Sequence, residues 1–375
     1  MAKTASKKTN TSSKKTLISE SSYQFLKEYI NNPSPVGFET SGQKLWLNYI
    51  TKYVDTTFTD PYGTAVGVIN PDAPFKVVIE AHADEISWFV NYINEQGLIY
   101  LKRNGGVDHQ IAPAKRVWIH GKKGPVKAVF GWPAIHTRLG NPDNKEQQPK
   151  VDNLSLDCGA RTKKEVEDLG IHIGAVVTYE EGFDELANGY YIGRAFDNRI
   201  GGFMIAEVAR LLKENKKKLP FSLYVVNAVQ EEIGLRGAEM IARRIKPDIA
   251  IITDVTHDTS TPMISKIVEG DIQCGKGPSL AYAPAIHNKL LAVVEEVAQK
   301  NKIPVQFRTL SRSTGTDTDS FAYANDGCPS VLISMPLRYM HTTVEMIHHD
   351  DIEETIKLMY HTLLTLTPKT NLSYL

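Results

Sequence analysis

Residues 75–85 read FKVVIEAHADE, an almost continuous apolar run that gives way at once to a histidine and two acidic residues. Apolar runs of this length are typical of strands that are buried on both faces of a sheet. Similar runs occur at residues 223–229 (LYVVNAV), 249–253 (IAIIT) and 329–334 (PSVLIS). We therefore predict four buried strands in one sheet.

Amphipathic segments precede, separate and follow these strands. Apolar residues recur at helical spacing in residues 20–31, 40–53, 200–212, 237–245, 287–300 and 352–364. Strands that alternate with helices predict an α/β fold with a largely parallel sheet covered by helices on both faces.

Residues 86–190 have a different pattern. Short β-like runs and glycines are frequent there, and the one expected helix is short, near residues 163–169. Many short strands without long helices predict a small β-barrel or sandwich. Because this region interrupts the α/β pattern, we predict an inserted domain at 86–190 within an α/β domain formed by 18–85 and 191–375.

Composition excludes several classes of protein. The chain has 375 residues, 43 basic and 43 acidic, and 42% of its residues are hydrophobic, as in ordinary globular proteins. Balanced charge argues against a nucleic-acid partner, and we find no run of about 20 apolar residues that would span a membrane. Cys158, Cys274 and Cys328 form neither a C-x-x-C pair nor a disulfide framework, which predicts a cytoplasmic protein.

The amino-terminal residues 1–17 are unlike the rest. They hold five lysines and no acidic residue, so the remaining 38 basic residues face 43 acidic ones, a formal charge of −5. The other residues are mostly small and polar, without the apolar run of a signal peptide. We interpret 1–17 as a disordered Lys/Ser/Thr-rich tail, with a targeting or nucleic-acid role as the less favoured alternative.

Polar side chains cluster where the predicted strands end. Ligands of open α/β sheets bind at the carboxyl ends of the strands. The residues expected there are His82, Glu231, Glu232, Asp254 and His341, and Asp197 would join them from the start of the helix near 200. Two imidazoles with several carboxylates suit zinc, and two divalent cations would offset the repulsion between the acidic groups. Such a centre predicts hydrolysis of an amide bond.

Two pairs of neighbours suggest supporting roles. Asp84 follows His82 by two residues, so on an extended chain it could hold the second imidazole nitrogen. Glu231 and Glu232 are adjacent, so their side chains should point in different directions. One would then bind metal while the other serves as general base. Taken singly, each residue has an ordinary explanation, such as a helix cap or a solvated loop. Their convergence on one sheet edge favours a site.

Two further motifs are better explained by a role in helix formation than by metal binding. We interpret His348-His349-Asp350-Asp351 as a helix start capped by Asp350 and not as a second metal cluster. The stretch GTDTDS at 315–320 lacks the spacing of a calcium loop. We expect it to start a helix near Phe321 and to line the substrate pocket.

The chain resembles the co-catalytic zinc aminopeptidases that assemble as tetrahedral (TET) particles, often labelled glutamyl aminopeptidase, deblocking aminopeptidase or endoglucanase-like. The matching segments are AHADEI at 81–86, GRAFDNRIGG at 193–202, VQEEIGLRGA at 229–238, ITDVT at 252–256, PKVDNLSLDCGARTKKEVEDLGIHIG at 149–174 and the run from 315 to 345. The resemblance implies a zinc-peptidase fold whose inserted domain is a PDZ-like or barrel-like dimerisation module. It also implies a dodecamer that admits only short peptides.

The resemblance assigns a role to each candidate residue. It implies that His82, Asp197 and Asp254 bind one metal and that Asp197, Glu232 and His341 bind the other, with Asp197 bridging. Glu231 would be the general base or acid, and Asp84 the partner of His82. The metals would be two divalent ions per subunit, zinc, with cobalt and manganese as alternatives.

The chain departs from the family pattern at three places. Ser87-Trp88 and Asn198 stand where the family often has Gly and Asp, and the run after Asp254 is unlike the usual one. None of these departures removes an expected ligand.

The combined expectation is a cytoplasmic, homo-oligomeric metallo-aminopeptidase that acts on peptides with a free amino terminus. The nearest alternative is a deacylase of N-acyl amino acids on the same metal centre. A non-catalytic scaffold remains the alternative from another class if no metal binds, and a cellulase, which needs a metal-free carboxylate pair, is weakly supported.

Overall fold

The computed structural model describes residues 16–139 and 148–375. Most of the predicted tail at 1–17 therefore lies outside the described residues. Its last two residues are placed, because the hydroxyl of Thr16 and the amide of Leu17 both donate to the Glu353 carboxylate, each at 2.6 Å. No helix in the described part of the chain is long and apolar enough to cross a membrane.

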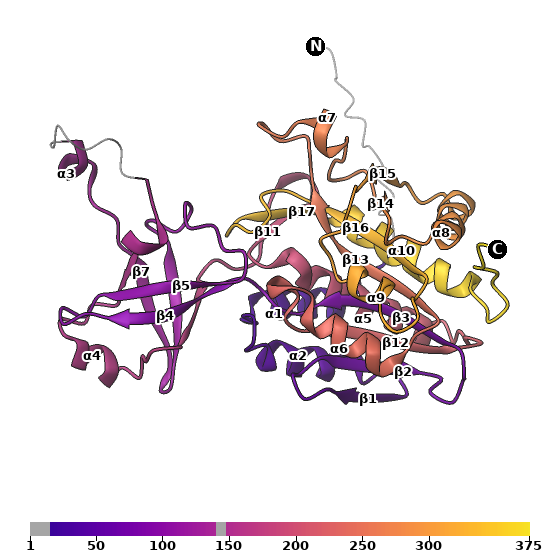
Figure 1. The fold of residues 1–375 in the computed structure, drawn as a ribbon, viewed down its shortest axis with the longest axis horizontal. Helices are drawn as coiled ribbons and strands as arrows, with labels where there is room; N and C mark the ends of the chain where they lie inside the picture. Colours follow the sequence, from indigo (N-terminus) through magenta and orange to yellow (C-terminus); the bar gives the residue numbers. More distant parts are fainter. Residues whose placement is uncertain (1–15, 140–147) are drawn as a thin grey trace, which may run out of the picture.

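An eight-stranded sheet forms the centre of the α/β body (Figure 1). Its spatial order is β1 (Thr56–Thr59), β2 (Ala65–Ile69), β12 (Ser222–Ala228), β3 (Lys76–His82), β13 (Ile249–His257), β16 (Ser330–Leu337), β14 (Ser279–Tyr282) and β15 (Gln306–Thr309). The four central strands β12, β3, β13 and β16 are parallel, and they are the four buried strands predicted from sequence. The pairs β1–β2, β2–β12 and β14–β16 are antiparallel, whereas the edge strand β15 runs parallel to β14.

Helices pack on both faces of this sheet, which confirms the predicted α/β architecture. One group is α1 (Glu20–Asn31), α2 (Thr40–Ile50), α5 (Phe196–Glu214), α8 (Asn288–Asn301) and α10 (His349–Thr365); the other is α6 (Arg236–Ile245) and α9 (Thr318–Ala322). Successive side chains of β3 point to opposite faces of the sheet, so they face the two groups of helices in turn. Ala81 lies against Gly201 of α5, whereas Glu80 meets Asp317 at the start of α9. His82 therefore shares the α9 face with Glu80.

The predicted inserted barrel is present and stands to one side of the α/β body (Figure 1). It closes through β4 (Ser87–Ile93), β5 (Ile99–Asn104), β8 (Ser155–Asp157), β7 (Gly124–Phe130), β6 (Arg116–Gly121) and β9 (Val176–Tyr179), and it carries α3 (Ile135–Leu139) and α4 (Lys163–Asp168). It has a hydrophobic core of its own, which includes Trp88. The boundaries 86–190 and the dimerisation role stay predictions.

A small three-stranded sheet follows the barrel and contacts the α/β body. It consists of β10 (Asp184–Glu185), β11 (Tyr190–Gly193) and β17 (Glu345–His348). Because β17 leads directly into α10 and β11 leads into α5, this sheet fixes both helix starts beside the central strands.

Two local predictions were wrong. The cap of α10 is His348 and not Asp350: the His348 side chain, already held at the end of β17, accepts the amide of Asp350 at 3.1 Å. The strand predicted at 249–253 continues to His257, because β16 pairs with it as far as Leu337. Asp254 consequently lies inside β13 and not beyond its end.

Gly237 packs closely against backbone at the carboxyl edge of the sheet. A Cβ there would lie 2.2 Å from the carbonyl oxygen of Val229, which follows β12. We expect Gly237→Ala to reduce the free energy of unfolding by about 3 kcal/mol, because backbone must move to relieve the overlap. Urea titration of the wild type and of the variant would measure this change in the free energy of unfolding.

The matched control is Gly131→Ala in an exposed barrel loop, where the nearest atom to an added Cβ is 3.9 Å away. Its stability should change by less than about 0.5 kcal/mol. Equal stability of the Gly237→Ala variant and the wild type would contradict the proposed packing.

Candidate active site

Register brings the predicted polar residues to one edge of the sheet. Ala228, the last residue of β12, pairs with His82, the last residue of β3. On the other side Ile252 pairs with Glu80, so Asp254, two residues further along β13, reaches the level of His82. A short 3-10 turn, η3 (Glu231–Ile233), follows β12 and brings both glutamates to the same edge.

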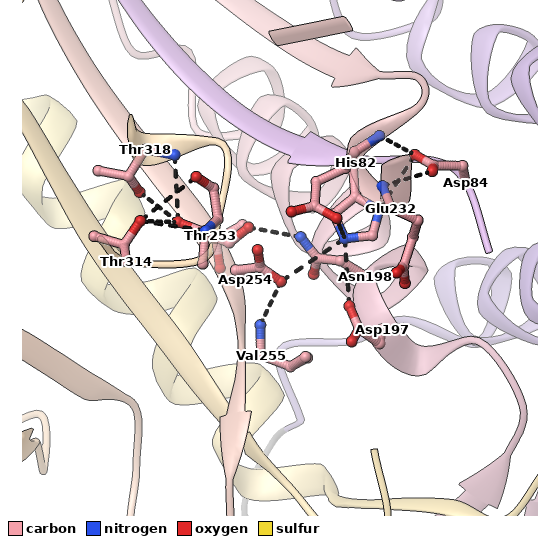
Figure 2. A network of polar contacts seen from close by, with 12 residues as sticks. His82, Asp84, Asp197, Asn198, Glu232, Thr253, Asp254, Val255, Thr314 and Thr318 are labelled. Atoms are coloured by element: carbon pink, nitrogen blue, oxygen red, sulfur yellow. Dashed lines mark hydrogen bonds and ion pairs between the residues drawn. The ribbon is translucent and has the colours of Figure 1, made fainter. Parts of the chain in front are cut away.

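The imidazole of His82 lies at the centre of this group (Figure 2). Its Nε2 is 3.3 Å from Asp197 Oδ1, 3.8 Å from Glu231 Oε2 and 3.9 Å from Asp254 Oδ1. His82, Asp197 and Asp254 are all buried. The carboxylates come from three different elements, α5, η3 and β13, so only the folded chain assembles them.

The second imidazole approaches from the loop between β16 and β17. His341 Nε2 lies 3.2 Å from Asp197 Oδ2 and 3.4 Å from Glu232 Oε1. The two oxygens of Asp197 therefore face two different histidines. A carboxylate in this position can bridge two cations.

Asp84 connects the ends of β3 and β12. It accepts the backbone amide of Glu231 on Oδ1 at 3.0 Å and that of Glu232 on Oδ2 at 3.1 Å. Its Oδ1 also lies 3.4 Å from Nδ1 of His82, the nitrogen that points away from the other carboxylates. One buried carboxylate thus fixes the His82 ring and the glutamate turn together, as Figure 2 shows.

Several non-glycine residues beside the site have left-handed backbone. They include Ala195 (φ 59°), Gln230 (φ 58°), Leu235 (φ 62°) and His341 (φ 60°). This conformation costs roughly 1–2 kcal/mol for residues other than glycine. His341 is itself a candidate ligand, Gln230 directly precedes Glu231, and Ala195 lies two residues before Asp197. Strain of this kind is common at functional sites.

The electrostatics of the site reflect crowded carboxylates. Burial raises the pKa of Glu231 to about 10 and that of Asp254 to about 7. Burial lowers the pKa of His341, but its hydrogen bonds with the Asp197 and Glu232 carboxylates outweigh this and raise it to about 12. Burial raises the pKa of Asp197, yet the two histidines hold it below its usual range. The negative groups therefore require positive charge close by.

The donor set fits divalent metal ions. Ligand atoms of His82, Glu231 and Asp254 lie within 4.8 Å of one another, and so do those of His82, Asp197 and Glu232. Two imidazoles with surrounding carboxylates are the ligands that zinc prefers, and cations would offset the repulsion among the buried acidic groups.

Sequence reasoning missed Glu345. Its buried carboxylate accepts the backbone amide of Asp197 at 3.1 Å and that of His341 at 2.8 Å. It thus holds two candidate ligands by their main chain. No sequence signal identified Glu345, because its partners lie on α5 and on a loop that only the fold brings to β17.

A second missed feature is the carboxyl pair of Glu80 and Asp317 behind His82. Both side chains are buried and meet across the β3–α9 contact. Burial raises the pKa of Glu80 to about 8 and that of Asp317 well above its usual range, so one proton can be shared between them. An acidic residue inside the apolar run FKVVIEA was the signal that could have indicated such a pair.

Two of the three family departures, Ser87-Trp88 and Asn198, have structural explanations. Trp88 packs in the barrel core, and Ser87 accepts a hydrogen bond from Asn104 at 2.8 Å, so neither belongs to the ligand cluster. Asn198 donates to the carbonyl oxygen of Thr253 at 2.8 Å and ties the Asp197 segment to β13 (Figure 2). An ionised aspartate could not donate this hydrogen bond.

A cleft of about 630 Å³ opens beside the carboxylate cluster. Besides candidate ligands, it is lined by Arg308, Thr256 and several residues of the 313–319 loop. The GTDTDS stretch lies where the sequence led us to expect it, since it lines the cleft and leads into α9.

A helix-covered α/β sheet with two histidines and several carboxylates at its carboxyl edge is the arrangement of a metal-dependent hydrolase. Comparison with known sequences and structures makes the class specific. The sequence profile of the M42 glutamyl aminopeptidases matches residues 63–358, and the chain belongs to this family. It is therefore a metal-dependent aminopeptidase, which confirms the predicted family, fold and reaction.

Relatives support this assignment along almost the whole chain. A lysyl aminopeptidase of Pyrococcus furiosus is 32% identical over 349 residues, covering 92% of this chain and 98% of its own length. A glutamyl aminopeptidase of Lactococcus lactis is 29% identical, covering 74% and 76%. The solved TET aminopeptidase of a marine sediment archaeon of the Thaumarchaeota superposes with a TM-score of 0.89 at 28% identity, covering 94% and 99%.

The role of Asp84 can be tested with Asp84→Asn. The amide retains one acceptor oxygen but presents an NH₂ group toward a backbone amide that needs an acceptor. We expect metal affinity to fall about 10–100-fold, as for other residues that orient ligands. Competition with a chelator, read out by elemental analysis, would measure this change.

The control is Asp326→Asn, an exposed residue in the loop after α9. Its metal affinity should equal that of the wild type. Unchanged affinity in Asp84→Asn as well would show that Asp84 does not organise the site.

Proposed function

We propose that the enzyme holds two divalent metal ions per subunit, zinc in the first instance. His82, Asp197 and Asp254 would bind one ion, and Asp197, Glu232 and His341 the other. The observation that carries this proposal is the position of Asp197, whose Oδ1 and Oδ2 face His82 and His341 at 3.3 and 3.2 Å. Cobalt and manganese suit the same donors.

Glu231 would act as general base and acid. When bound, the two ions supply Lewis-acid polarisation of the scissile carbonyl and lower the pKa of the attacking water. Glu231 would accept the proton of that water and deliver it to the leaving amine. Its carboxylate lies beside His82, and its backbone amide is held by Asp84, so the group is fixed in orientation.

The substrates would be peptides with a free amino terminus, and the enzyme would hydrolyse their first peptide bond. The names of the two relatives, lysyl and glutamyl aminopeptidase, differ in substrate. Family membership therefore does not fix the preferred amino-terminal residue.

Assembly and location are further parts of the proposal. A solved neighbour from Pyrococcus horikoshii, 24% identical, assembles into a tetrahedron or a large octahedral shell. By analogy this chain would form a homo-oligomer, such as a dodecamer, with barrel residues 86–190 as the dimerisation domain. The three unpaired cysteines support a cytoplasmic location.

Glu231→Gln tests the general base. The amide retains size and hydrogen bonding but cannot accept the proton, so we expect kcat to fall about 10²–10⁴-fold. Metal content should stay unchanged, because Glu231 is not assigned as a ligand. Hydrolysis of leucyl-anilide gives kcat, elemental analysis gives the metal content, and N-acetyl-leucyl-anilide should resist cleavage.

A nearly normal kcat would remove Glu231 from the mechanism. Loss of one metal ion together with activity would instead make Glu231 a ligand. Cleavage of the acetylated compound in preference to the free one would indicate a deacylase.

His82→Ala and Asp197→Asn test the ligand assignment. Each removes a donor from the proposed centre, and Asp197→Asn weakens the bridge, so both should bind fewer than two ions per subunit. Metal analysis after gel filtration measures the occupancy. His136→Ala, an exposed histidine of α3, is the control that should bind the wild-type amount. Full occupancy in either site variant would refute the assignment.

A further inference from the structure

The candidate ligands are held in two groups by two different carboxylates. The first group contains His82 and the glutamate turn η3, which Asp84 organises. The second group contains Asp197 and His341, whose backbone amides both donate to Glu345. Each of the two proposed metal ions would take ligands from both groups. The position of one group relative to the other must therefore be fixed as well.

A buried ion pair joins the two groups. Glu85 directly follows Asp84, and Arg194 lies three residues before Asp197. The guanidinium of Arg194 donates through Nη1 to Oε2 of Glu85. The side chains of Arg194 and Glu85 are only 7% and 4% exposed, so water cannot replace either partner. Removal of one member of such a pair leaves a buried charge without its counterion.

Both members of the pair have further partners that fix their geometry. Oε1 of Glu85 accepts the backbone amide of Ser34 at 2.7 Å, and Nη1 of the fully buried Arg199 lies 3.8 Å from the same oxygen. Arg194 also donates through Nη2 to the carbonyl oxygen of Asn31 at 3.3 Å. The two side chains are thus held against the segment that follows α1, and the pair has one defined arrangement.

The pair lies next to the candidate ligands. Glu85 and Arg194 line the same small cavity as Asp197, Glu232 and His341. The chain enters the barrel strand β4 shortly after Glu85, and β11, through which it returns to α5, ends directly before Arg194. The ion pair therefore joins the two connections between the barrel and the α/β body where they pass the site.

We propose that Glu85 and Arg194 are positioning residues that set the distance between the two ligand groups. This inference rests on the proposed metal centre. The ion pair holds the segment of Asp84 against the segment of Asp197, so the ligands are arranged before any ion arrives. Without the pair the two segments can separate. Part of the binding energy of each ion is then used to reassemble its ligands, and each ion binds more weakly.

The test uses Glu85→Gln, Arg194→Gln, Arg194→Lys and a double variant with glutamine at both positions. Glutamine at position 85 retains an acceptor oxygen for the Ser34 amide but turns an NH₂ group toward the guanidinium. Lysine at position 194 keeps the positive charge without the planar fork. The double variant removes both charges of the pair, so it should fold even where a single variant leaves an unpaired charge and does not.

Each metal-free, full-length protein is titrated with Co²⁺, and the visible absorption of the bound ion gives its affinity. Circular dichroism at the same temperature shows that the protein is folded. We expect Glu85→Gln and Arg194→Gln each to weaken Co²⁺ binding about 10–100-fold. Arg194→Lys should weaken it less. The double variant should lose about as much as one single variant, because the two residues act as one unit.

A second buried pair of the same type is the matched control. Nη2 of Arg210 lies 2.7 Å from Oε2 of Glu207 on α5, with side chains 5% and 0% exposed. Neither residue lines the cleft or the small cavity beside the ligands. Glu207→Gln and Arg210→Gln should lower the melting temperature, as the Glu85 and Arg194 variants do, and leave the Co²⁺ affinity at the wild-type value.

Three results would overturn the inference. The first is wild-type Co²⁺ affinity in folded Glu85→Gln and Arg194→Gln. The second is an equal loss of affinity in the Glu207 and Arg210 variants, which would show a general effect of stability. The third is a loss in the double variant equal to the sum of both single losses. Failure of the wild type to bind Co²⁺ would instead refute the proposed metal centre itself.

Discussion

The carboxylate of Asp84 is the interaction on which the geometry of the site depends. It is buried at the end of β3 and accepts the backbone amides of Glu231 and Glu232, which follow β12. β3 and β12 are adjacent parallel strands in a fixed register. The Asp84 contact between their ends therefore fixes the positions of His82 and both glutamates relative to one another. Glu345 does the same on the opposite side, where it holds the amides of Asp197 and His341. Two carboxylates that bind only protein thus position those that face the cleft.

Charge explains why such a site needs cations. The formal charge of the whole chain is zero, yet acidic groups from β3, α5, η3, β13 and β17 converge on one edge of the sheet. Burial raises the pKa of Glu231 to about 10, which shows how unfavourable another negative charge is there. Bound divalent ions would remove this cost and hold the ligand segments together, so metal binding and stability of the local fold should be linked.

Much of this arrangement was predictable from the sequence, because the buried strands are readable as apolar runs and their carboxyl ends must meet. His82, Glu231 and Asp254 were located in this way, although β13 proved longer than expected. Glu345 and Asn198 were not, because each acts on backbone groups that are distant along the chain. The cap of α10 was assigned wrongly since sequence statistics favour aspartate, whereas β17 had already placed His348 there. The distinction between ligand and base came from family resemblance and not from spacing.

The candidate metal ligands and the outer wall of the cleft belong to different parts of the sheet. The proposed ligands include His82 at the end of β3, Glu232 after β12 and Asp254 within β13, so a change in the register of these central strands would displace several of them at once. Arg308 lies on β15, the edge strand, which pairs with β14 alone. An edge strand can change a side chain without disturbing the register of the central strands, so the outer wall of the cleft is less constrained than the central strands that hold the candidate ligands. Two relatives of this chain carry different substrate names, lysyl and glutamyl, so the family keeps one reaction with different amino-terminal residues.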